Sequence, residues 1–478
     1  MDSLKTKAKT ALAFALAIVL ICLAVSCSPY VRLDGTLPDA YVPKPGGKIK
    51  LNYYIAGTDQ LTKAVNDYVR EFQQKYPDVT VQAMLSSRDR SQIQAEIASR
   101  SVGDVFFLFE SDVYNYAQTQ RALMPLDYYV EAYGVDLSNI FSAMVDMGTV
   151  NGKLYMATCN YNHIIYYYNK DMIKAANLED PADLQEAGTW DWDTFKDYCR
   201  QLTFMDETTG KKYVGCTLRL GYSAEYIPFL EGFGGKWYDT ENKKVSFVSD
   251  DRVLRGVREM CDFVAMNVCK YSAVSQSTVA TKSVKKTISQ ENFLDYNDMN
   301  QVCFRAGEHD NMVSIGQAYD QAGIDWDVVA VPALPTHKVG TGCSGFAVYN
   351  GTKNPDAAAA LALTILTEDG QRAYHGQDGG AVPNIKSLAY NSSYWRVPFA
   401  DRSDDPDYGK NYNAFISFPE ADTYAFVECV IPPEVAEIVR KYMQNVVPEH
   451  VNGERDVENT LTLLETEANE KWESIYNK

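Results

Sequence analysis

The chain has 478 residues, of which 46% are hydrophobic and 23% are charged, so its composition is that of a globular protein rather than a disordered one. Its formal net charge of −18 argues against nucleic-acid binding, because that affinity depends on Lys and Arg side chains that neutralise phosphates. The same charge argues against attachment to anionic lipid through surface charge. The length suffices for two or three domains with their own cores.

The N-terminal residues have the features of an export signal. Three lysines precede a short apolar run, 11–25, and small residues follow it. The run is shorter than the roughly 20 apolar residues that a membrane-spanning helix needs. Residues 23–27, LAVSC, resemble a bacterial lipobox, in which the signal is cut before a cysteine that carries diacylglycerol. We therefore expect removal of 1–26 and lipidation of Cys27, with a simple secretory signal and a chance cysteine as the alternative.

After Cys27 the chain predicts a tether followed by an α/β domain. Residues 27–47 include four prolines and show no periodicity, as in a flexible tether. The next segments alternate between strand and helix patterns: strands at 48–57, 79–85 and 104–109, and helices at 61–78 and 91–100. This order predicts a parallel sheet covered by helices. Ligands of such sheets meet the loops at the carboxyl ends of the strands, which here are 56–59 and 110–112.

Further along the chain, a glycine pattern raises the question of a dinucleotide site. Residues 339–350, VGTGCSGFAVYN, contain G-x-G-x-x-G. A phosphate-binding turn must open a helix, whereas these glycines precede a strand pattern, and the first helix signal is the pair Asn354-Pro355. The context therefore disfavours a dinucleotide site. Asp191 is placed to cap the N-terminus of the helix that follows it, and 457–477 predict a long final helix.

The cysteines and histidines give no sign of a metal site. None of the ten cysteines forms C-x-x-C, and a large exported domain does not need disulfide staples. Cys261 and Cys269 fall on one predicted helix, too far apart to bridge. We expect mostly buried free thiols. The five histidines are scattered without H-E-x-x-H, so no metal and no cofactor is predicted.

A series of motifs in order decides the interpretation. The motifs are N-G-K at 151–153, Y-N-K-D at 168–171, W-D-W-D-T-F at 190–195, the double glycine at 234–235 and the glycine-rich stretch at 340–345. Their order resembles that of the extracellular solute-binding proteins of ABC importers, the maltose-binding type. The resemblance covers almost all of the mature chain. One departure is Thr158, which stands where the family often has proline in its first crossing between lobes.

The resemblance implies a two-lobed periplasmic-binding-protein-like α/β fold, each lobe with a central, mostly parallel sheet flanked by helices. It implies an N-terminal lobe of 48–157 and 347–415, a C-terminal lobe of 163–340 and 418–478, and hinge crossings between them. Gly340, Gly342 and Gly345 are then expected to let the backbone pass close to the ligand and move between lobes, since glycine adopts dihedrals that other residues resist.

The resemblance also implies positions for ligand contacts. Tyr54 and Asp59 are expected in the loop after the first strand, and Glu110 and Asp112 follow the third. The remaining candidates are Asn162 in the hinge crossing, Tyr222 and Tyr319 in the second lobe, and Tyr424 in the last inter-lobe segment. For each tyrosine the alternative is core packing, and for each carboxylate a solvated loop or a helix cap.

The function implied is that of a binding protein rather than an enzyme. The acidic charge and the 33 tyrosines, 19 phenylalanines and 6 tryptophans suit carbohydrate, since flat rings stack on sugar faces and carboxylates accept hydroxyl hydrogen bonds. We expect a monomer, lipid-anchored to the outer face of the bacterial cell membrane, that captures a neutral mono- or oligosaccharide and passes it to the permease subunits. The alternative is a secreted glycoside hydrolase, which needs two suitably spaced carboxylates; no sequence signature places such a pair.

Overall fold

The computed structural model describes residues 41–54, 59–86, 90–272, 301–308, 315–375, 382–391, 395, 409–417, 423–424 and 431–476. The predicted signal and lipidation site at Cys27 therefore lie outside the described residues. Within the described part, no helix has the length and apolar character that a bilayer crossing requires.

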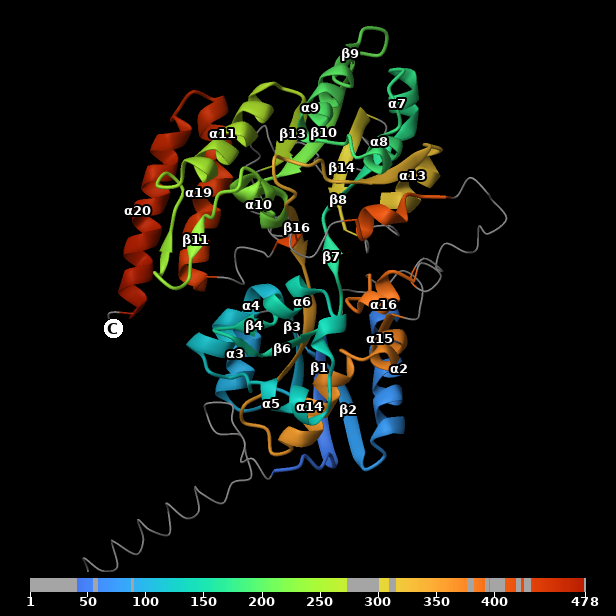
Figure 1. Cartoon of the computed structure of the whole chain (residues 1–478), viewed down its shortest axis with the longest axis vertical. Coiled ribbons are helices and arrows are strands. Elements are labelled where there is room, and N and C mark those ends of the chain that lie inside the picture. The colour runs from blue at the N-terminus through green and yellow to red at the C-terminus, as the bar shows by residue number, and fades with distance from the viewer. Residues whose placement is uncertain are drawn as a thin grey trace, which may run out of the picture. The chain divides into compact units, whose positions relative to one another are not determined.

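One lobe, called the N-lobe here, is built on a five-stranded sheet (Figure 1). Its strands, in spatial order, are β2 (Val79–Ser86), β1 (Gly47–Tyr54), β3 (Val105–Phe109), β17 (Ser344–Val348) and β6 (Met156–Thr158). β1 pairs in parallel with β2 and β3, which confirms the predicted parallel sheet, whereas β17 pairs antiparallel with both its neighbours. Its helices include α2 (Asp59–Lys75), α3 (Arg90–Ala98), α14 (Pro355–Thr364) and α15 (Glu368–His375).

The other lobe, the C-lobe, is built on a six-stranded sheet. The strand order is β13 (Cys269–Ser272), β10 (Lys211–Arg219), β14 (Val302–Gly307), β8 (Ile165–Asn169) and β15 (Trp326–Ala330), with β9 (Phe204–Asp206) paired to β10. β8 runs antiparallel to both neighbours, and β10 runs parallel to β13 and β14. The carboxyl ends of β10, β14 and β15 therefore lie at one edge. Helices of this lobe include α9 (Trp192–Gln201), α11 (Asp251–Ala265), α19 (Pro433–Val451) and α20 (Val457–Tyr476).

A three-stranded ribbon joins the lobes (Figure 1). It consists of β7 (Asn162–His163), β16 (Val339–Gly342) and β18 (Thr423–Tyr424). β16 pairs antiparallel with β7 and parallel with β18. Since β7 lies between β6 and β8 in the chain, and β16 between β15 and β17, the chain crosses from one sheet to the other at each of these strands. The predicted two-lobed fold with hinge crossings is confirmed.

The remaining elements are short. They are α4 (Glu110–Tyr114), η1 (Asn115–Thr119), α5 (Asp127–Ala132), η2 (Leu137–Asn139), α6 (Ser142–Met147), β4 (Thr149–Val150), β5 (Lys153–Leu154), α7 (Lys170–Ala175), α8 (Pro181–Ala187), α10 (Ser223–Glu231), β11 (Tyr238–Asp239), β12 (Lys244–Val245), α13 (Gln317–Ala322), α16 (Lys386–Ala389) and η8 (Tyr412–Phe415). η8 lies beside β15, where the Asn411 amide donates to Asp327 Oδ1 at 2.7 Å.

Two of the motifs that carry the resemblance build the C-lobe. Asp191 caps α9, as predicted, by accepting from the Thr194 amide at 2.8 Å. The Trp192 ring packs edge-on against Phe263 at 4.9 Å in the core. Asn169 of the Y-N-K-D motif caps α7 through the Met172 amide. The residues of these two motifs thus cap helices and pack in the core.

The glycines of β16 and β17 are required by close backbone contact. A Cβ atom at Gly340 would lie 1.8 Å from the Ala224 carbonyl oxygen in α10, and one at Gly345 would lie 2.3 Å from that of Ala157 in β6. The described positive-φ residues include neither of them. The expectation that unusual dihedrals explain these two glycines is therefore wrong; close packing does.

The thiols are buried and unbridged in the described part of the chain. These seven cysteines are Cys159, Cys199, Cys216, Cys261, Cys269, Cys303 and Cys343. Cys269 does not share a helix with Cys261, contrary to prediction. α11 ends at Ala265, Asn267 adopts a φ of 60°, and Cys269 begins β13.

Candidate ligand-binding site

On the N-lobe, buried carboxylates follow the carboxyl end of β3, where the sequence predicts them. Glu110 and Asp112 are 7% and 8% exposed. Glu110 Oε2 accepts from the Cys343 amide at 3.1 Å, and the Glu110 amide donates to the Cys343 carbonyl at 3.2 Å. Glu110 is thereby fixed to the junction of β16 and β17, beside the crossing.

On the crossing itself, Asn162 holds a buried amide. The residue is 7% exposed, and it pairs with Gly342 across the β7–β16 ladder. The Thr341 hydroxyl donates to the Asn162 carbonyl. Asn162 Oδ1 has no hydrogen-bond partner among the described residues. A buried amide oxygen left without a donor is unfavourable, so a ligand hydroxyl at this point would relieve that penalty.

At the carboxyl edge of the C-lobe sheet, the structure adds residues that the sequence analysis did not select. Arg219 ends β10 and forms an ion pair with Glu225 of α10, and its amide donates to Glu225 Oε2 at 2.7 Å. The guanidinium lies 4.9 Å from the ring centroid of Tyr222. The Tyr222 hydroxyl donates to the carboxylate of Glu308, which follows β14. Tyr222 and Glu308 come together because β10 and β14 are parallel neighbours in the sheet, which the sequence alone does not reveal.

Glu110 of the N-lobe acts electrostatically on Tyr222 of the C-lobe. Burial raises the pKa of Tyr222 well above its usual value; the carboxylate of Glu308 raises it further, and Glu110 adds a smaller increase. The hydroxyl of Tyr222 therefore stays protonated and acts as a donor at neutral pH.

Tyr319 lies in the C-lobe interior and is not brought to this group. Its side chain is fully buried, and its ring stacks on Trp326 at 6.0 Å. Tyr54 is the last residue of β1, and Asp59 is the first residue of α2. Tyr424 of β18 pairs with Gly340 of β16. The side chains of these last three lie outside what the structure describes.

A buried polar network holds the N-lobe end of the first crossing. Asn384 Nδ2 donates to both the carbonyl and the hydroxyl oxygen of Thr158, at 2.8 Å each. Gln371 Nε2 donates to the Cys159 carbonyl at 3.3 Å. Both amide side chains are fully buried. Thr158, which stands where the family often has proline, is thus fixed through hydrogen bonds.

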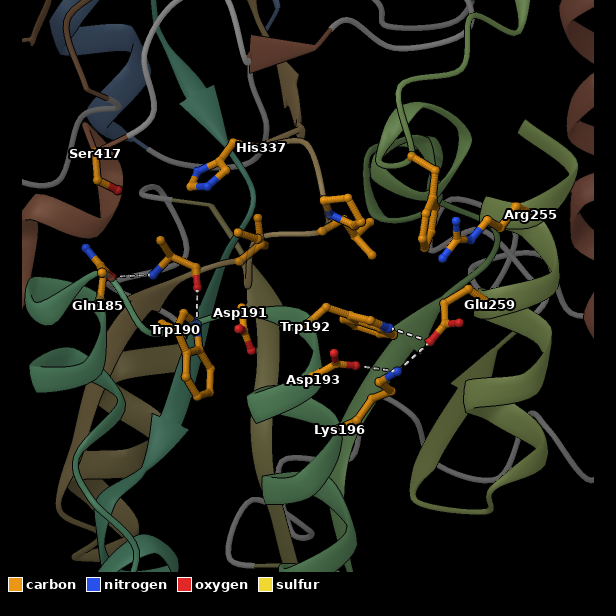
Figure 2. Close-up of a pocket in the computed structure, with 17 residues that line it drawn as sticks. Gln185, Trp190, Asp191, Trp192, Asp193, Lys196, Arg255, Glu259, His337 and Ser417 are labelled. Atoms are coloured by element: carbon orange, nitrogen blue, oxygen red, sulfur yellow. Dashed lines mark hydrogen bonds and ion pairs between the residues drawn. The ribbon is translucent and has the colours of Figure 1, made fainter. Parts of the chain in front are cut away.

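The C-lobe also contains a pocket of about 670 Å³ (Figure 2). At its wall, Lys196 lies between Asp193 at 2.9 Å and Glu259 at 2.7 Å, and the Trp192 indole donates to Glu259. Its lining residues are Gln185, Gly188, Trp190, Asp191, Trp192, Asp193, Lys196, Phe233, Arg255, Glu259, Ala330, Val331, Ala333, Leu334, Pro335, His337 and Ser417.

This pocket is separate from the group around Tyr222. Phe233 at the pocket follows the end of α10, whereas Tyr222 precedes its start. The nine residues of α10 span about 13 Å, so one sugar ring cannot contact both. The pocket contains none of the predicted ligand contacts. In the described part of the chain, no group of three or more His, Cys, Asp or Glu side chains is arranged to hold a metal ion.

Comparison with known proteins identifies the family. Residues 67–400 match the family model described as bacterial extracellular solute-binding protein. The sugar-binding protein MalE from Xanthomonas citri has a similar structure, with a TM-score of 0.68 at 14% identity over 90% of this chain and 98% of that chain. The cyclic alpha-maltosyl-1,6-maltose binding protein from Arthrobacter globiformis has a TM-score of 0.66 at 18% identity, over 90% of this chain and 100% of that chain.

MalE from Listeria monocytogenes, in complex with maltose, has a TM-score of 0.63 at 16% identity over 90% of this chain and 99% of that chain. At these identities the structures show the shared two-lobed fold, and the family model covers well over half of the sequence. The predicted resemblance is thus confirmed, and the chain belongs to the bacterial extracellular solute-binding proteins.

Proposed function

We propose that the protein is the substrate-binding lipoprotein of an ABC importer, which captures a neutral mono- or oligosaccharide between its lobes and delivers it to the membrane permease. The observation that carries the proposal is the buried Asn162 oxygen, which has no partner among the described residues and lies on the crossing strand next to Gly342. Structural neighbours whose names specify sugar, maltose or a maltose-containing ring support a carbohydrate as the ligand.

The proposed ligand contacts are distributed over both lobes and the crossing between them. Glu110 belongs to the N-lobe, Tyr222 to the C-lobe and Asn162 to the crossing. A ligand that bonds to all three makes more contacts when the lobes close on it than when they open. Only such a difference in affinity between two conformations can drive closure.

The test is Asn162→Ala. Calorimetry against a panel of starch, plant and mucin oligosaccharides identifies the ligand of the unaltered protein. We expect the variant to lose roughly 1–3 kcal/mol of binding free energy, or roughly 5- to 150-fold in affinity, because a ligand hydroxyl loses its buried acceptor. The melting temperature without ligand should stay unchanged.

Asn445→Ala, on the exposed face of α19, is the matched control and should bind normally. If Asn162→Ala lowers the melting temperature but retains affinity, Asn162 is structural and the site assignment is wrong. Mass spectrometry of the recovered sugar tests the hydrolase alternative. We expect intact sugar after overnight incubation; cleavage that a carboxylate substitution abolishes would instead support a secreted glycoside hydrolase.

A further inference from the structure

Arg219 occupies a position where an arginine ordinarily indicates an anion receptor. It lies at the carboxyl end of β10, beside the proposed ligand contact Tyr222. Guanidinium groups recognise carboxylates and phosphates through paired hydrogen bonds. An acidic sugar would therefore be the first expectation for a site that contains this residue.

The guanidinium of Arg219 is anchored within the protein through Nε and Nη2. Its side chain is 13% exposed, and that of its partner Glu225 is 3% exposed. Nε donates to Glu225, the Arg219 amide donates to the same carboxylate at 2.7 Å, and Nη2 donates to the Ala306 carbonyl at 3.4 Å. Turning the guanidinium toward a ligand would leave a buried glutamate without its counterion, which is strongly unfavourable.

The same guanidinium orients an aromatic ring. It lies 4.9 Å from the ring centroid of Tyr222, a distance typical of a cation held over an aromatic face. At the other end of the ring, the hydroxyl donates to Glu308. Glu308 is itself held, because its carbonyl accepts from the Tyr167 hydroxyl at 2.6 Å. The ring of Tyr222 is therefore fixed both on a face and at its hydroxyl before any ligand binds.

The surroundings of Tyr222 also disfavour an anionic ligand. The carboxylate of Glu308 accepts from its hydroxyl, and Glu110 of the N-lobe lies close enough to act on it electrostatically. A ligand carboxylate placed against this ring would meet two carboxylates, and the one cation there, Arg219, is already paired with Glu225. The hydroxyl groups of a neutral sugar would meet hydrogen-bond acceptors.

We propose that Arg219 is a positioning residue for Tyr222 rather than an anion receptor, and that its pairing with Glu225 makes the site select neutral sugars over acidic sugars of the same skeleton. This inference rests on the proposed function, since it presumes that Tyr222 contacts the sugar. Three residues then determine the specificity of the site: Arg219, Glu225 and Glu308.

The experiment compares each neutral sugar that binds with its C6-oxidised counterpart, a uronic acid, by calorimetry at two salt concentrations. The unaltered protein should bind the neutral form at least about tenfold more tightly. Arg219→Lys keeps a charge for Glu225 but loses the planar group over the ring, so affinity for the neutral sugar should fall by about tenfold. Uronate binding should not improve.

Glu308→Gln keeps an oxygen acceptor for the Tyr222 hydroxyl and removes a negative charge. We expect neutral binding within about threefold of the original and a gain of about tenfold for the uronate, larger at low salt. Arg255→Lys is the matched control, because Arg255 also lies over an aromatic ring, that of Phe233, at 4.5 Å, but at the separate C-lobe pocket. It should change neither affinity.

The outcomes separate the two proposals. If no sugar of either kind binds the unaltered protein, the proposed function fails and this inference fails with it. If the uronate binds more tightly than the neutral sugar, or if Arg219→Lys abolishes uronate binding alone, Arg219 is an anion receptor; the inference is then overturned while the binding function stands. Should Arg219→Lys not fold, the selectivity ratio of Glu308→Gln decides.

Discussion

Two buried histidines near the first crossing would destabilise the fold if they became protonated. His163 of β7 is 2% exposed and donates from Nε2 to the Ala414 carbonyl at 2.9 Å. His375 of α15 is 6% exposed and donates to the Cys159 carbonyl. Burial lowers the pKa of each to about 4, against the opposing effect of its hydrogen bond. Both are neutral at pH 7 in the folded protein.

These histidines predict a loss of stability in mild acid. In the unfolded chain each titrates near pH 6.5, so between pH 6.5 and about 4 the unfolded state binds more protons, and the stability falls as the pH falls through that window. The loss reaches at most about 3 kcal/mol for each histidine. Denaturant unfolding at pH 7 and pH 5 should show the fall, and His163→Asn with His375→Asn should reduce it.

The control for this measurement is His337→Gln, which replaces an exposed histidine, keeps both buried ones and should therefore retain the fall in stability. A double variant that retains the full dependence would show that other groups cause it.

At the residue scale, sequence patterns indicate where a polar side chain lies along the chain but not which side chains contact it. Glu110 and Asn162 could be selected because one follows a buried strand and the other lies in a recognisable crossing motif. Arg219 and Glu308 could not, because they are 89 residues apart in the sequence and reach the same ring, that of Tyr222, only through the pairing of β10 with β14. Tyr319 was proposed as a ligand contact but is buried in the core, because the sequence does not distinguish a core tyrosine from one that faces a ligand.

At the scale of elements, the contact between β16 and α10 depends on one missing side chain. A methyl group at Gly340 would lie 1.8 Å from a backbone oxygen of α10, and backbone cannot rotate away as a flexible side chain can. We expect Gly340→Ala to lower the free energy of unfolding by about 1–3 kcal/mol, the usual range for overpacking, or more. Denaturant titration measures the change.

Gly46→Ala is the control for that variant, because its added methyl would lie 3.9 Å from the nearest atom, an ordinary contact. It should change the stability by less than about 0.5 kcal/mol. Equal stability of Gly340→Ala and the unaltered protein would contradict the close contact between β16 and α10.

Local patterns predicted most elements of the N-lobe sheet but not the order of its strands. The segments β1, β2 and β3 alternate with helices and follow the expected parallel order. β17 was predicted as a strand from its residues, yet nothing local indicates that it lies between β3 and β6, because that position is set by packing of segments more than 180 residues apart. Cys269 was wrongly predicted to lie on the same helix as Cys261 for a related reason: the helical pattern of α11 gives no sign of where the helix ends and β13 starts.

At the scale of the whole molecule, the proposed lipid anchor would determine where the two lobes work. The motivation is the sequence LAVSC at 23–27. We expect Cys27→Ala to release the protein into the medium and to abolish labelling with a fatty-acid analogue, because two acyl chains anchor stably. Fractionation and labelling measure both. Ser28→Ala is the matched control and should stay anchored; unchanged retention of Cys27→Ala would contradict lipidation.

The buried thiols give the folded protein a set of internal reporters. Five of the seven described cysteines belong to the C-lobe, and Cys159 and Cys343 lie at the crossings. A thiol reacts with an alkylating reagent only when water reaches it, so each cysteine records how often its own surroundings open. Mass-resolved alkylation kinetics can therefore time the opening of the hinge and of the C-lobe separately, in one sample and without an engineered probe.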